Sequence, residues 1–388
     1  MLEALEGSQA IARAVALCRP QVVAAYPITP QTHIVENISK LVADGRLDTQ
    51  LVSVESEFSA ASVVLGAAAA GSRAYTASSS QGILLMAEVL YNIAGLRLPM
   101  VLTCANRALG APINIWNDHQ DSMAVRDSGW IQLHCADNQE AVDTTIQAFR
   151  ISEATDLPVM VCMDGFVLTH TLETIEMPDH KVVDKFLPPF KFARALDPRN
   201  PISLGTLVGP EYFSEIRHAQ HKAMTDALET IVEVDRLWEK ASGRACGGLF
   251  TVEGPADAKV GVLAMGSVVS TFREAMAELP SRKKAKLINL RAFRPFPAAA
   301  LMAACEGLTD IVVVDRALSP GWGGILGGEV KAVLADMKKP PRVHNVALGL
   351  GGRDVPLEAW TAVVAEAKEP AGFRILDLEP AKLEPSDL

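Results

Sequence analysis

Four short segments carry residue types that could do chemistry, and each follows an apolar run typical of a β-strand. Thr29 lies in Tyr-Pro-Ile-Thr-Pro (26–30), Glu57 ends Ser-Val-Glu-Ser-Glu (53–57), Arg107 follows Val-Leu-Thr-Cys-Ala, and five polar residues occupy 117–121. Because ligands of parallel α/β sheets bind beyond the carboxyl ends of the strands, these residues are candidates for one site.

Thr29 and Glu57 each have a chemical and a structural interpretation. The prolines on either side of Ile28-Thr29 restrict the backbone, so the loop could present the Thr29 hydroxyl in one geometry; alternatively, Thr29 caps the next helix. Glu57 opens a helix of small apolar residues that is expected to be buried. A buried carboxylate is costly unless it is satisfied. The helix dipole could stabilise it, or it could exchange a proton with a ligand nitrogen.

Arg107 and the segment 117–121 leave similar alternatives open. A guanidinium keeps its charge and requires an anion, which could be an internal carboxylate or the carboxylate of a substrate. Asn-Asp-His-Gln-Asp (117–121) places a histidine between carboxylates, which could indicate metal binding or acid–base work. The alternative is that this run of hydrogen-bonding side chains organises its own loop.

A repeated strand–helix pattern in the first 165 residues positions these segments. Short apolar runs that alternate with helical patterns predict a parallel sheet covered on both faces. The expected strands are 21–25, 50–54, 74–77, 100–105, 131–134 and 159–163, and the expected helices are 31–43, 57–70, 81–93 and 138–152.

A second α/β unit is expected after residue 258. Its strands are predicted at 260–264, 286–289, 310–315 and 343–346, and its helices at 271–278, 298–305 and 325–335. Residues 176–210 are rich in proline and predict a long ordered excursion over the surface or across a partner, followed by a helix over 211–241. The predicted domains are 1–244 with the excursion at 176–210, a linker at 245–258, and 259–388.

Composition narrows the class of protein. The 388 residues include 36 Lys and Arg against 46 Asp and Glu, a net charge of −10, with no basic run, which argues against a nucleic-acid partner. No apolar stretch reaches the ~20 residues of a membrane span, and the N-terminus lacks the features of a signal peptide, so a cytoplasmic location is expected. The six cysteines have no CxxC spacing and are expected to be buried reduced thiols.

A series of motifs in order resembles one known family. In the first unit they are YPITP, Ser-Glu at the start of the small-residue helix, TASSSQG (76–82), the Arg107 segment, NDHQD and MDGFVLTH (163–170); the second adds LRAFRPFP (290–297), VVVDRALSPGWGG (312–324) and GLGGRD (349–354). Together they resemble the α subunit of 2-oxoacid:ferredoxin oxidoreductases, the pyruvate synthase group. The resemblance implies an α/β fold: a parallel-sheet domain of the thiamine-diphosphate-binding type, followed by an α/β domain like the C-terminal domain of transketolase.

The resemblance also implies roles for residues. Glu57 matches the glutamate that hydrogen-bonds the aminopyrimidine ring of thiamine diphosphate. Proton exchange between this glutamate and a ring nitrogen favours the imino form of the ring. Thr29 and Arg107 match residues that hold the substrate carboxylate. The resemblance thus implies that Glu57 is catalytic and that Thr29, Arg107 and Ile28 bind the substrate. The cofactor would be bound by Glu57, Pro27, Ser80 and Gln81. Support for the loop or the site is expected from Asn117, Asp118, His119 and Gln120, and no metal ligand is expected. Trp116 with Ile28 is expected to shape the pocket for the substrate side chain.

The implied reaction is oxidative decarboxylation of a 2-oxoacid to acyl-CoA and CO2. Pyruvate is the expected substrate, with branched-chain and aryl 2-oxoacids (phenylglyoxylate, indolepyruvate) as alternatives. The chain lacks the family's GDG diphosphate motif, so a thiamine-diphosphate-binding β subunit is expected to supply the diphosphate and Mg²⁺ site. A ferredoxin-like iron–sulfur subunit and a γ subunit are the other implied partners. Ferredoxin or another acceptor takes the electrons, and coenzyme A takes the acyl group.

Three other hypotheses remain open. The chain could be a non-catalytic structural subunit of such a complex, although it retains Thr29, Glu57 and Arg107 together. It could be a nicotinamide-dependent dehydrogenase, although Gly321–Gly327 misses the GxGxxG spacing by one residue. A transketolase-like enzyme would need a complete diphosphate site in this chain, and none is visible.

Overall fold

The computed structural model describes residues 2–278 and 285–387, which form two compact units. The first contains Met1–Thr251 and Leu290–Pro297, and the second contains Val252–Asn289 and Ala298–Leu388. The short segment Leu290–Pro297 therefore belongs with the first unit, although it lies inside the range predicted for the second domain.

The sheet of the first unit has seven strands in the order β12-β6-β7-β5-β4-β2-β3. Its strands run parallel to one another except β12, which pairs antiparallel with β6. They are β2 (Val22–Ala25), β3 (Gln50–Ser53), β4 (Ala74–Ser78), β5 (Val101–Asn106), β6 (Ile131–His134), β7 (Val159–Asp164) and β12 (Ala292–Arg294). The loops after β2, β3, β4 and β5 hold the candidate residues and so share one edge of the sheet.

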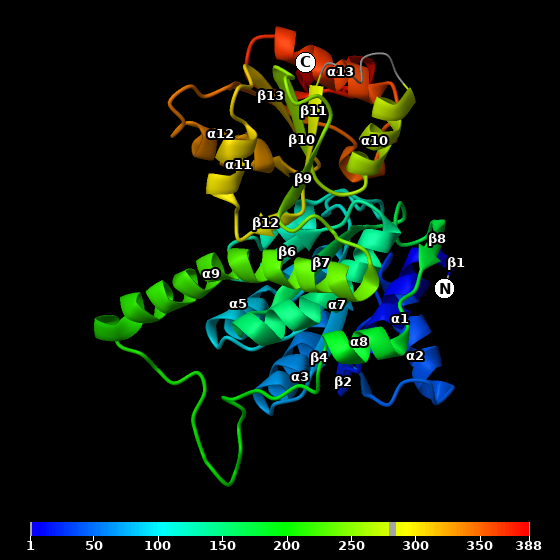
Figure 1. Cartoon of the computed structure of the whole chain (residues 1–388), viewed down its shortest axis with the longest axis vertical. Helices are drawn as coiled ribbons and strands as arrows, with labels where there is room; N and C mark the ends of the chain where they lie inside the picture. Colours follow the sequence, from blue (N-terminus) through cyan, green and yellow to red (C-terminus); the bar gives the residue numbers. More distant parts are fainter. Residues whose placement is uncertain (1, 279–284, 388) are drawn as a thin grey trace. The chain divides into compact units, whose positions relative to one another are not determined.

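Helices cover both faces of this sheet, so β4, β5, β6 and β7 are buried along their whole length. In β7, Val159 and Val161 join a buried cluster that includes residues of α1, α2, α7, α8 and α9, whereas Met160 and Cys162 join another with α3 and α5 (Figure 1). The helices are α1 (Gly7–Cys18), α2 (Thr32–Ala43), α3 (Glu57–Ala69), α4 (Ser80–Leu85), α5 (Ala87–Gly95), α6 (Gln120–Ala124), α7 (Asn138–Thr155), α8 (His180–Phe186) and α9 (Pro210–Ser242).

Two elements near the N-terminus were not expected from the sequence. β1 (Leu2–Glu6) pairs antiparallel with β8 (Leu172–Glu176) in a separate two-stranded ribbon, and α1 follows β1 directly. The predicted excursion at 176–210 contains α8 and then an irregular segment that leads into α9.

The second unit contains a six-stranded sheet in the order β17-β16-β13-β10-β11-β9, with parallel pairing from β11 through β17. Its strands are β9 (Phe250–Glu253), β10 (Val260–Ala264), β11 (Ala285–Leu290), β13 (Asp310–Asp315), β16 (Arg342–Ala347) and β17 (Phe373–Ile375). Its helices are α10 (Val268–Glu278), α11 (Ala298–Ala304), α12 (Ile325–Leu334) and α13 (Ala359–Ala365).

The glycine-rich turn before α12 accommodates a buried side chain of the chain itself. Asp315 accepts the N–H groups of Leu326 and Gly327 at 2.8 and 2.9 Å, and burial raises the pKa of its carboxyl to about 6. A Cβ on Gly324 would lie 2.2 Å from Asp315 Oδ2. This carboxylate occupies the helix N-terminus at which the phosphate of a dinucleotide would bind, so the glycines do not support the dehydrogenase hypothesis.

Two further expectations concern the whole chain. All six cysteines are buried and free, as predicted. Among the described residues, none of the helices combines the length and apolar composition that crossing a membrane requires.

Candidate active site

Gln31 fastens the loop after β2 to the neighbouring strand β4. This side chain is fully buried; its Nε2 donates to the Ala77 carbonyl at 2.8 Å and its Oε1 accepts the Ile28 N–H at 3.3 Å. Pro27 and Thr29 are exposed, and Ile28 is half-buried. The loop therefore presents Thr29 to solvent at the carboxyl end of β2.

Arg107 lies against this loop at the carboxyl end of β5. Its side chain is buried, and it donates from Nη1 to the Thr29 carbonyl at 2.9 Å and from Nε to the Asn114 carbonyl at 3.0 Å. Burial lowers the pKa of Arg107, and the charge of Asp121 opposes the shift. A guanidinium carries five N–H donors, so it can bind an oxyanion while it keeps these two bonds. The contact uses the Thr29 carbonyl, and a role for the Thr29 hydroxyl stays a prediction.

Glu57 begins α3 in a space that a glycine leaves open. Ser56 caps the helix by accepting the Ser59 N–H at 3.2 Å, and Glu57 is only 6% exposed. A Cβ on Gly82 would lie 2.6 Å from Glu57 Oε1 and 2.4 Å from Ser78 Oγ, so the missing side chain makes room for both oxygens. Ser78 Oγ is buried and has no hydrogen-bond partner among the described residues. A buried carboxylate and an unsatisfied hydroxyl thus border the same space.

The segment after β4 holds the other predicted cofactor residues. Ser80 Oγ donates to the Ala108 carbonyl at 2.5 Å, and its backbone has a positive φ of 50°. Gln81 is exposed, and its Nε2 lies 2.8 Å from where a Cβ on Gly110 would be. Ser80 is therefore tied into the protein, whereas Gln81 lies at the surface beside the loop that follows Arg107.

Asp121 connects these segments, although no role of its own was predicted for it within the polar run 117–121. Its carboxylate accepts the backbone N–H of Ser80 at 2.8 Å, of Arg107 at 3.0 Å and of Ser122 at 2.8 Å, and the Asn106 amide at 2.8 Å. Burial raises the pKa of this carboxyl to about 7, against the lowering effect of the four donors. The residue fixes the loops after β4 and β5 relative to each other.

The rest of the polar run organises its own surroundings. Asn117, Asp118 and His119 are buried; Asp118 Oδ1 accepts the Gln120 N–H at 2.9 Å, and His119 Nε2 lies 2.8 Å from Asp164 Oδ1 at the end of β7. No group of metal-ligating side chains in the described part of the chain includes His119. These contacts favour the loop-organising interpretation over metal binding.

The structure therefore joins Thr29 to Arg107 directly, and Arg107 to Ser80 through Asp121. Asp121 lies inside the predicted polar run, so its hydrogen-bonding capacity could have pointed to it. Gly82 belongs to the TASSSQG motif, but only the structure shows that it makes room for Glu57. Trp116, expected to shape the substrate pocket, is exposed and lies 6.2 Å from Phe166, measured between ring centroids.

Comparison with known proteins shows the family to which this chain belongs. The family model described as pyruvate flavodoxin/ferredoxin oxidoreductase, thiamine diphosphate binding, matches residues 13–236, and the model described as pyruvate:ferredoxin oxidoreductase core domain II matches residues 258–359. The chain belongs to this family. The resemblance on which the site prediction rested is thereby confirmed.

Curated members of the pyruvate:ferredoxin oxidoreductase family match almost the whole chain. Pyruvate synthase subunit PorA of Methanosarcina barkeri is 43% identical over 372 residues, which are 95% of this chain and 92% of the relative. Ketoisovalerate oxidoreductase subunit VorA of Pyrococcus abyssi is 39% identical over 377 residues, which are 97% of this chain and 95% of the relative. The family thus includes subunits of enzymes named for different 2-oxoacids.

Solved structures confirm the predicted fold class. 2-Oxoglutarate:ferredoxin oxidoreductase from Magnetococcus marinus superposes with a TM-score of 0.72 at 21% identity, covering 95% of this chain and 65% of that one. The chain therefore spans about two-thirds of the length of that neighbour. A split-gene transketolase, described as an inactive β4 tetramer, gives 0.55 at 14% identity and covers 95% and 98% of the two chains.

Proposed function

We propose that this chain is the α subunit of a thiamine-diphosphate-dependent 2-oxoacid oxidoreductase. The reaction is the oxidative decarboxylation of a 2-oxoacid to acyl-CoA and CO2, with pyruvate as the substrate. The observation that carries the proposal is that one edge of one sheet presents both a buried guanidinium tied to Thr29 and a buried carboxylate, Glu57, at a helix start. The subunits named pyruvate synthase, 43% identical, support pyruvate.

Arg107 and Thr29 would bind the substrate carboxylate. The guanidinium offers charge-assisted N–H donors to a planar carboxylate, and its bonds to the Thr29 and Asn114 carbonyls hold it in place. Thr29 is exposed at the end of a loop that Gln31 anchors, so its hydroxyl is available as a second donor. Ile28 and Trp116 would contact the substrate side chain.

The residues around Glu57 fit the pyrimidine end of the cofactor. Ser78 Oγ has no partner in the described part of the chain, and Gly82 leaves open the space beside the Glu57 carboxylate. Glu57 would exchange a proton with a ring nitrogen, and Pro27, Ser80 and Gln81 would line the same region. Bound thiamine diphosphate would supply the electron sink that loss of CO2 from a 2-oxoacid requires.

The remaining parts of the enzyme would come from partner subunits. The chain has no GDG motif, and its six cysteines are buried, free thiols without CxxC spacing. A β subunit would therefore hold the diphosphate and Mg²⁺, a ferredoxin-like subunit would hold the iron–sulfur clusters, and a γ subunit would complete the assembly. Ferredoxin would accept the electrons, coenzyme A would accept the acyl group, and the complex would act in the cytoplasm.

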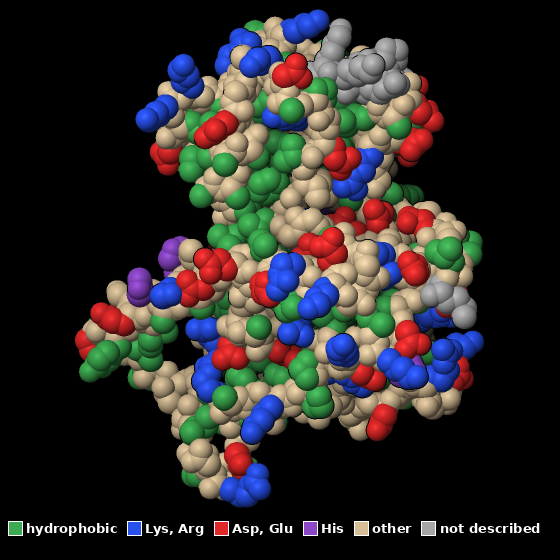
Figure 2. Space-filling model, in the orientation of Figure 1, with side chains coloured by type: hydrophobic (Ala, Val, Ile, Leu, Met, Phe, Trp, Pro, Cys, Tyr) green, Lys and Arg blue, Asp and Glu red, His purple; other side chains and the backbone are tan. Residues whose placement is uncertain are grey.

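An exposed apolar surface supports an assembly of this kind. We call residues 201–219 the arm; it comprises the end of the irregular segment and the first turns of α9. The apolar side chains of the arm that lie in solvent include Leu207, Tyr212, Phe213 and Ile216, which are 101%, 64%, 51% and 43% exposed. Figure 2 shows hydrophobic side chains at the tip of the arm. Exposed apolar patches of this kind indicate protein–protein contact.

The proposal is tested in the assembled complex, purified without oxygen. With thiamine diphosphate, coenzyme A and a viologen dye, pyruvate should reduce the dye faster than 2-oxoisovalerate, phenylglyoxylate or indolepyruvate. A preference for 2-oxoisovalerate would instead assign the branched-chain activity for which the 39% identical relative is named. If a complex that contains the cofactor and the clusters oxidises none of these acids, this chain would be a non-catalytic structural subunit.

Glu57→Gln is the first variant to make. The amide keeps the shape of the side chain but cannot exchange a proton, so turnover should fall by about two orders of magnitude or more, while assembly and circular dichroism stay unchanged. Turnover near that of the wild type would contradict the proton-exchange role.

A further inference from the structure

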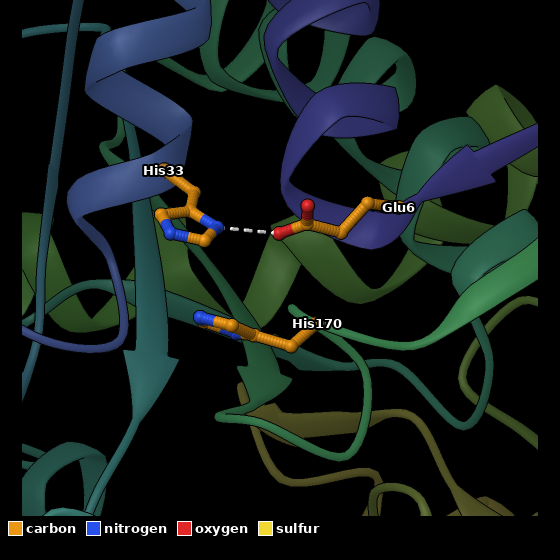
Figure 3. A group of neighbouring side chains, drawn as sticks. All are labelled: Glu6, His33 and His170. Atoms are coloured by element: carbon orange, nitrogen blue, oxygen red, sulfur yellow. Dashed lines mark hydrogen bonds and ion pairs between the residues drawn. The ribbon is translucent and has the colours of Figure 1, made fainter.

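Three side chains from distant parts of the chain converge beside the proposed substrate loop. Glu6 ends β1, His33 lies in the first turn of α2, and His170 lies between β7 and β8 (Figure 3). One potential ligand atom from each lies within 4.8 Å of the other two. Glu6 Oε1 is 2.7 Å from His33 Nδ1, and the two imidazole rings are 4.5 Å apart between centroids.

Backbone hydrogen bonds hold two of the three residues together. Glu6 is paired with Leu172 in the β1–β8 ribbon, two residues after His170. Just beyond Glu6, the N–H of Ser8 donates to the Thr169 carbonyl at 2.9 Å, and Ser8 Oγ donates to the same carbonyl at 2.8 Å. Hydrogen-bonded backbone thus keeps Glu6 and His170 close to each other.

The surroundings of His170 favour the tautomer in which Nε2 is free to bind a metal ion. Its Nδ1 lies 2.7 Å from the buried hydroxyl of Thr169, which also accepts the Phe166 N–H at 2.7 Å. With Nδ1–H donating to that hydroxyl, Nε2 keeps its lone pair for the cluster, the arrangement typical of metal-ligating histidines. Burial and the neighbouring His33 lower the pKa of His170, and Glu6 opposes this shift.

We propose that Glu6, His33 and His170 bind a divalent transition-metal ion, zinc in particular. Two histidines and one glutamate are a common ligand set of tetrahedral Zn²⁺, with water in the fourth position. Bonds of about 2.0–2.1 Å require ligand atoms roughly 3.3 Å apart, so the widest separation here, up to 4.8 Å, must contract on binding. The side chains of His33 and Glu6 are 44% and 28% exposed, which leaves a path for the ion and its water.

The ion would join the β1–β8 ribbon to the start of α2. His33 follows Thr29 by four residues and lies at the start of α2, so a metal here would also restrain the loop that presents Thr29. The simpler interpretation is a hydrogen bond between His33 and Glu6, with the tilted ring of His170 packed beside His33. The two interpretations differ in whether His170 contributes to cation affinity.

Cobalt is the direct probe, because tetrahedral Co²⁺ absorbs in the visible region whereas Zn²⁺ does not. The full-length chain, without an affinity tag, is treated with chelator and titrated with CoCl2, and Zn²⁺ is then added to displace the cobalt. We expect one equivalent bound, intense bands typical of four-coordination, and a rise in melting temperature with Zn²⁺ because the ion binds the folded state. Absence of saturable binding would overturn the proposal.

Variants identify the ligands. His33→Ala and His170→Ala should each lower the affinity for Co²⁺ and Zn²⁺ at least 100-fold, and Glu6→Gln should lower it at least tenfold. His180→Ala is the matched control, because His180 is an exposed histidine 3.5 Å from the Asp179 carboxylate that belongs to no group of three potential ligands within residues 2–278 and 285–387. This variant should bind like the wild type. Equal affinity in His170→Ala and the control would overturn the proposal. If His170→Ala fails to fold, His170→Gln answers the same question.

Discussion

At the scale of single residues, Asp121 shows how a site depends on groups that do not contact substrate. Its carboxylate accepts four N–H donors and so fixes Ser80 and Arg107 together. The sequence identified Thr29, Glu57 and Arg107 because each follows an apolar run and matches a family motif. It did not single out Asp121, since the donors on Ser80 and Arg107 lie 41 and 14 residues away.

Asp121→Asn should lower the free energy of unfolding by about 1–3 kcal/mol, because an amide nitrogen would face backbone N–H donors. The loss should depend on pH. The pKa of this carboxyl is about 7 in the folded protein and about 4 in an unfolded chain, so the folded state keeps a proton that the unfolded state has lost. Wild-type stability therefore falls as pH rises from about 4 to about 7.

Urea unfolding of both proteins at pH 5 and at pH 8 measures this effect. Because asparagine does not titrate, the stability gap between wild type and variant should be smaller at pH 8 than at pH 5. A gap that is equal at both pH values would show that Asp121 does not titrate in this range.

Arg107 makes a separate prediction about substrate. Arg107→Ala in the assembled complex should raise the KM for every 2-oxoacid by about 10-fold to 100-fold, since a charge-assisted hydrogen bond is worth about 1.5–3 kcal/mol. Arg107→Lys should recover part of this loss, because lysine keeps the charge but not the paired donor geometry. An unchanged KM and turnover in Arg107→Ala would show that the carboxylate is held elsewhere.

At the scale of elements, the strands of the parallel sheets were predictable from the sequence, whereas the β1–β8 ribbon was not. β6, β10 and β13 coincide with the predicted strands, because each is a short apolar run bounded by helical patterns. The helix predicted over 81–93 is present as α4 and α5, which meet at Met86. The β1–β8 ribbon could not be predicted, since its two strands are far apart in sequence and neither has a continuous apolar run.

The packing of α4 against α3 makes a prediction about Gly82. Gly82→Ala would place a methyl group 2.6 Å from Glu57 Oε1 and 2.4 Å from Ser78 Oγ, so the Glu57 side chain must move. Turnover of the complex should therefore fall at least tenfold, although alanine favours helix.

Gly66→Ala is the matched control, because Gly66 lies within α3 itself and its Cβ would meet nothing within 4 Å. This variant should keep full turnover and be slightly more stable. If the two variants had equal turnover, the space beside Glu57 would not be needed for catalysis.

At the scale of the whole molecule, Leu290–Pro297 returns from the second unit to the first. The sequence placed the motif LRAFRPFP with the second domain, because it lies between a strand and a helix of that domain. The contacts of Arg291 explain why this segment belongs to the first unit instead. Arg291 is fully buried in the first unit and donates to Gly248 at 2.8 Å, to Gln147 at 3.0 Å and to Thr144 at 3.1 Å.

Arg291→Ala should destabilise the first unit, although the residue lies between two stretches of the second. Its guanidinium is also 3.8 Å from the buried Glu140, and removing one partner of a buried ion pair costs about 3–5 kcal/mol. In scanning calorimetry this should lower the transition of the first unit by roughly 10 °C. Arg236→Ala, which removes an exposed partner of Glu233 on α9, should melt close to the wild type because surface pairs contribute little. A melting curve for Arg291→Ala that matches this control would mean that the first unit folds without the returning segment.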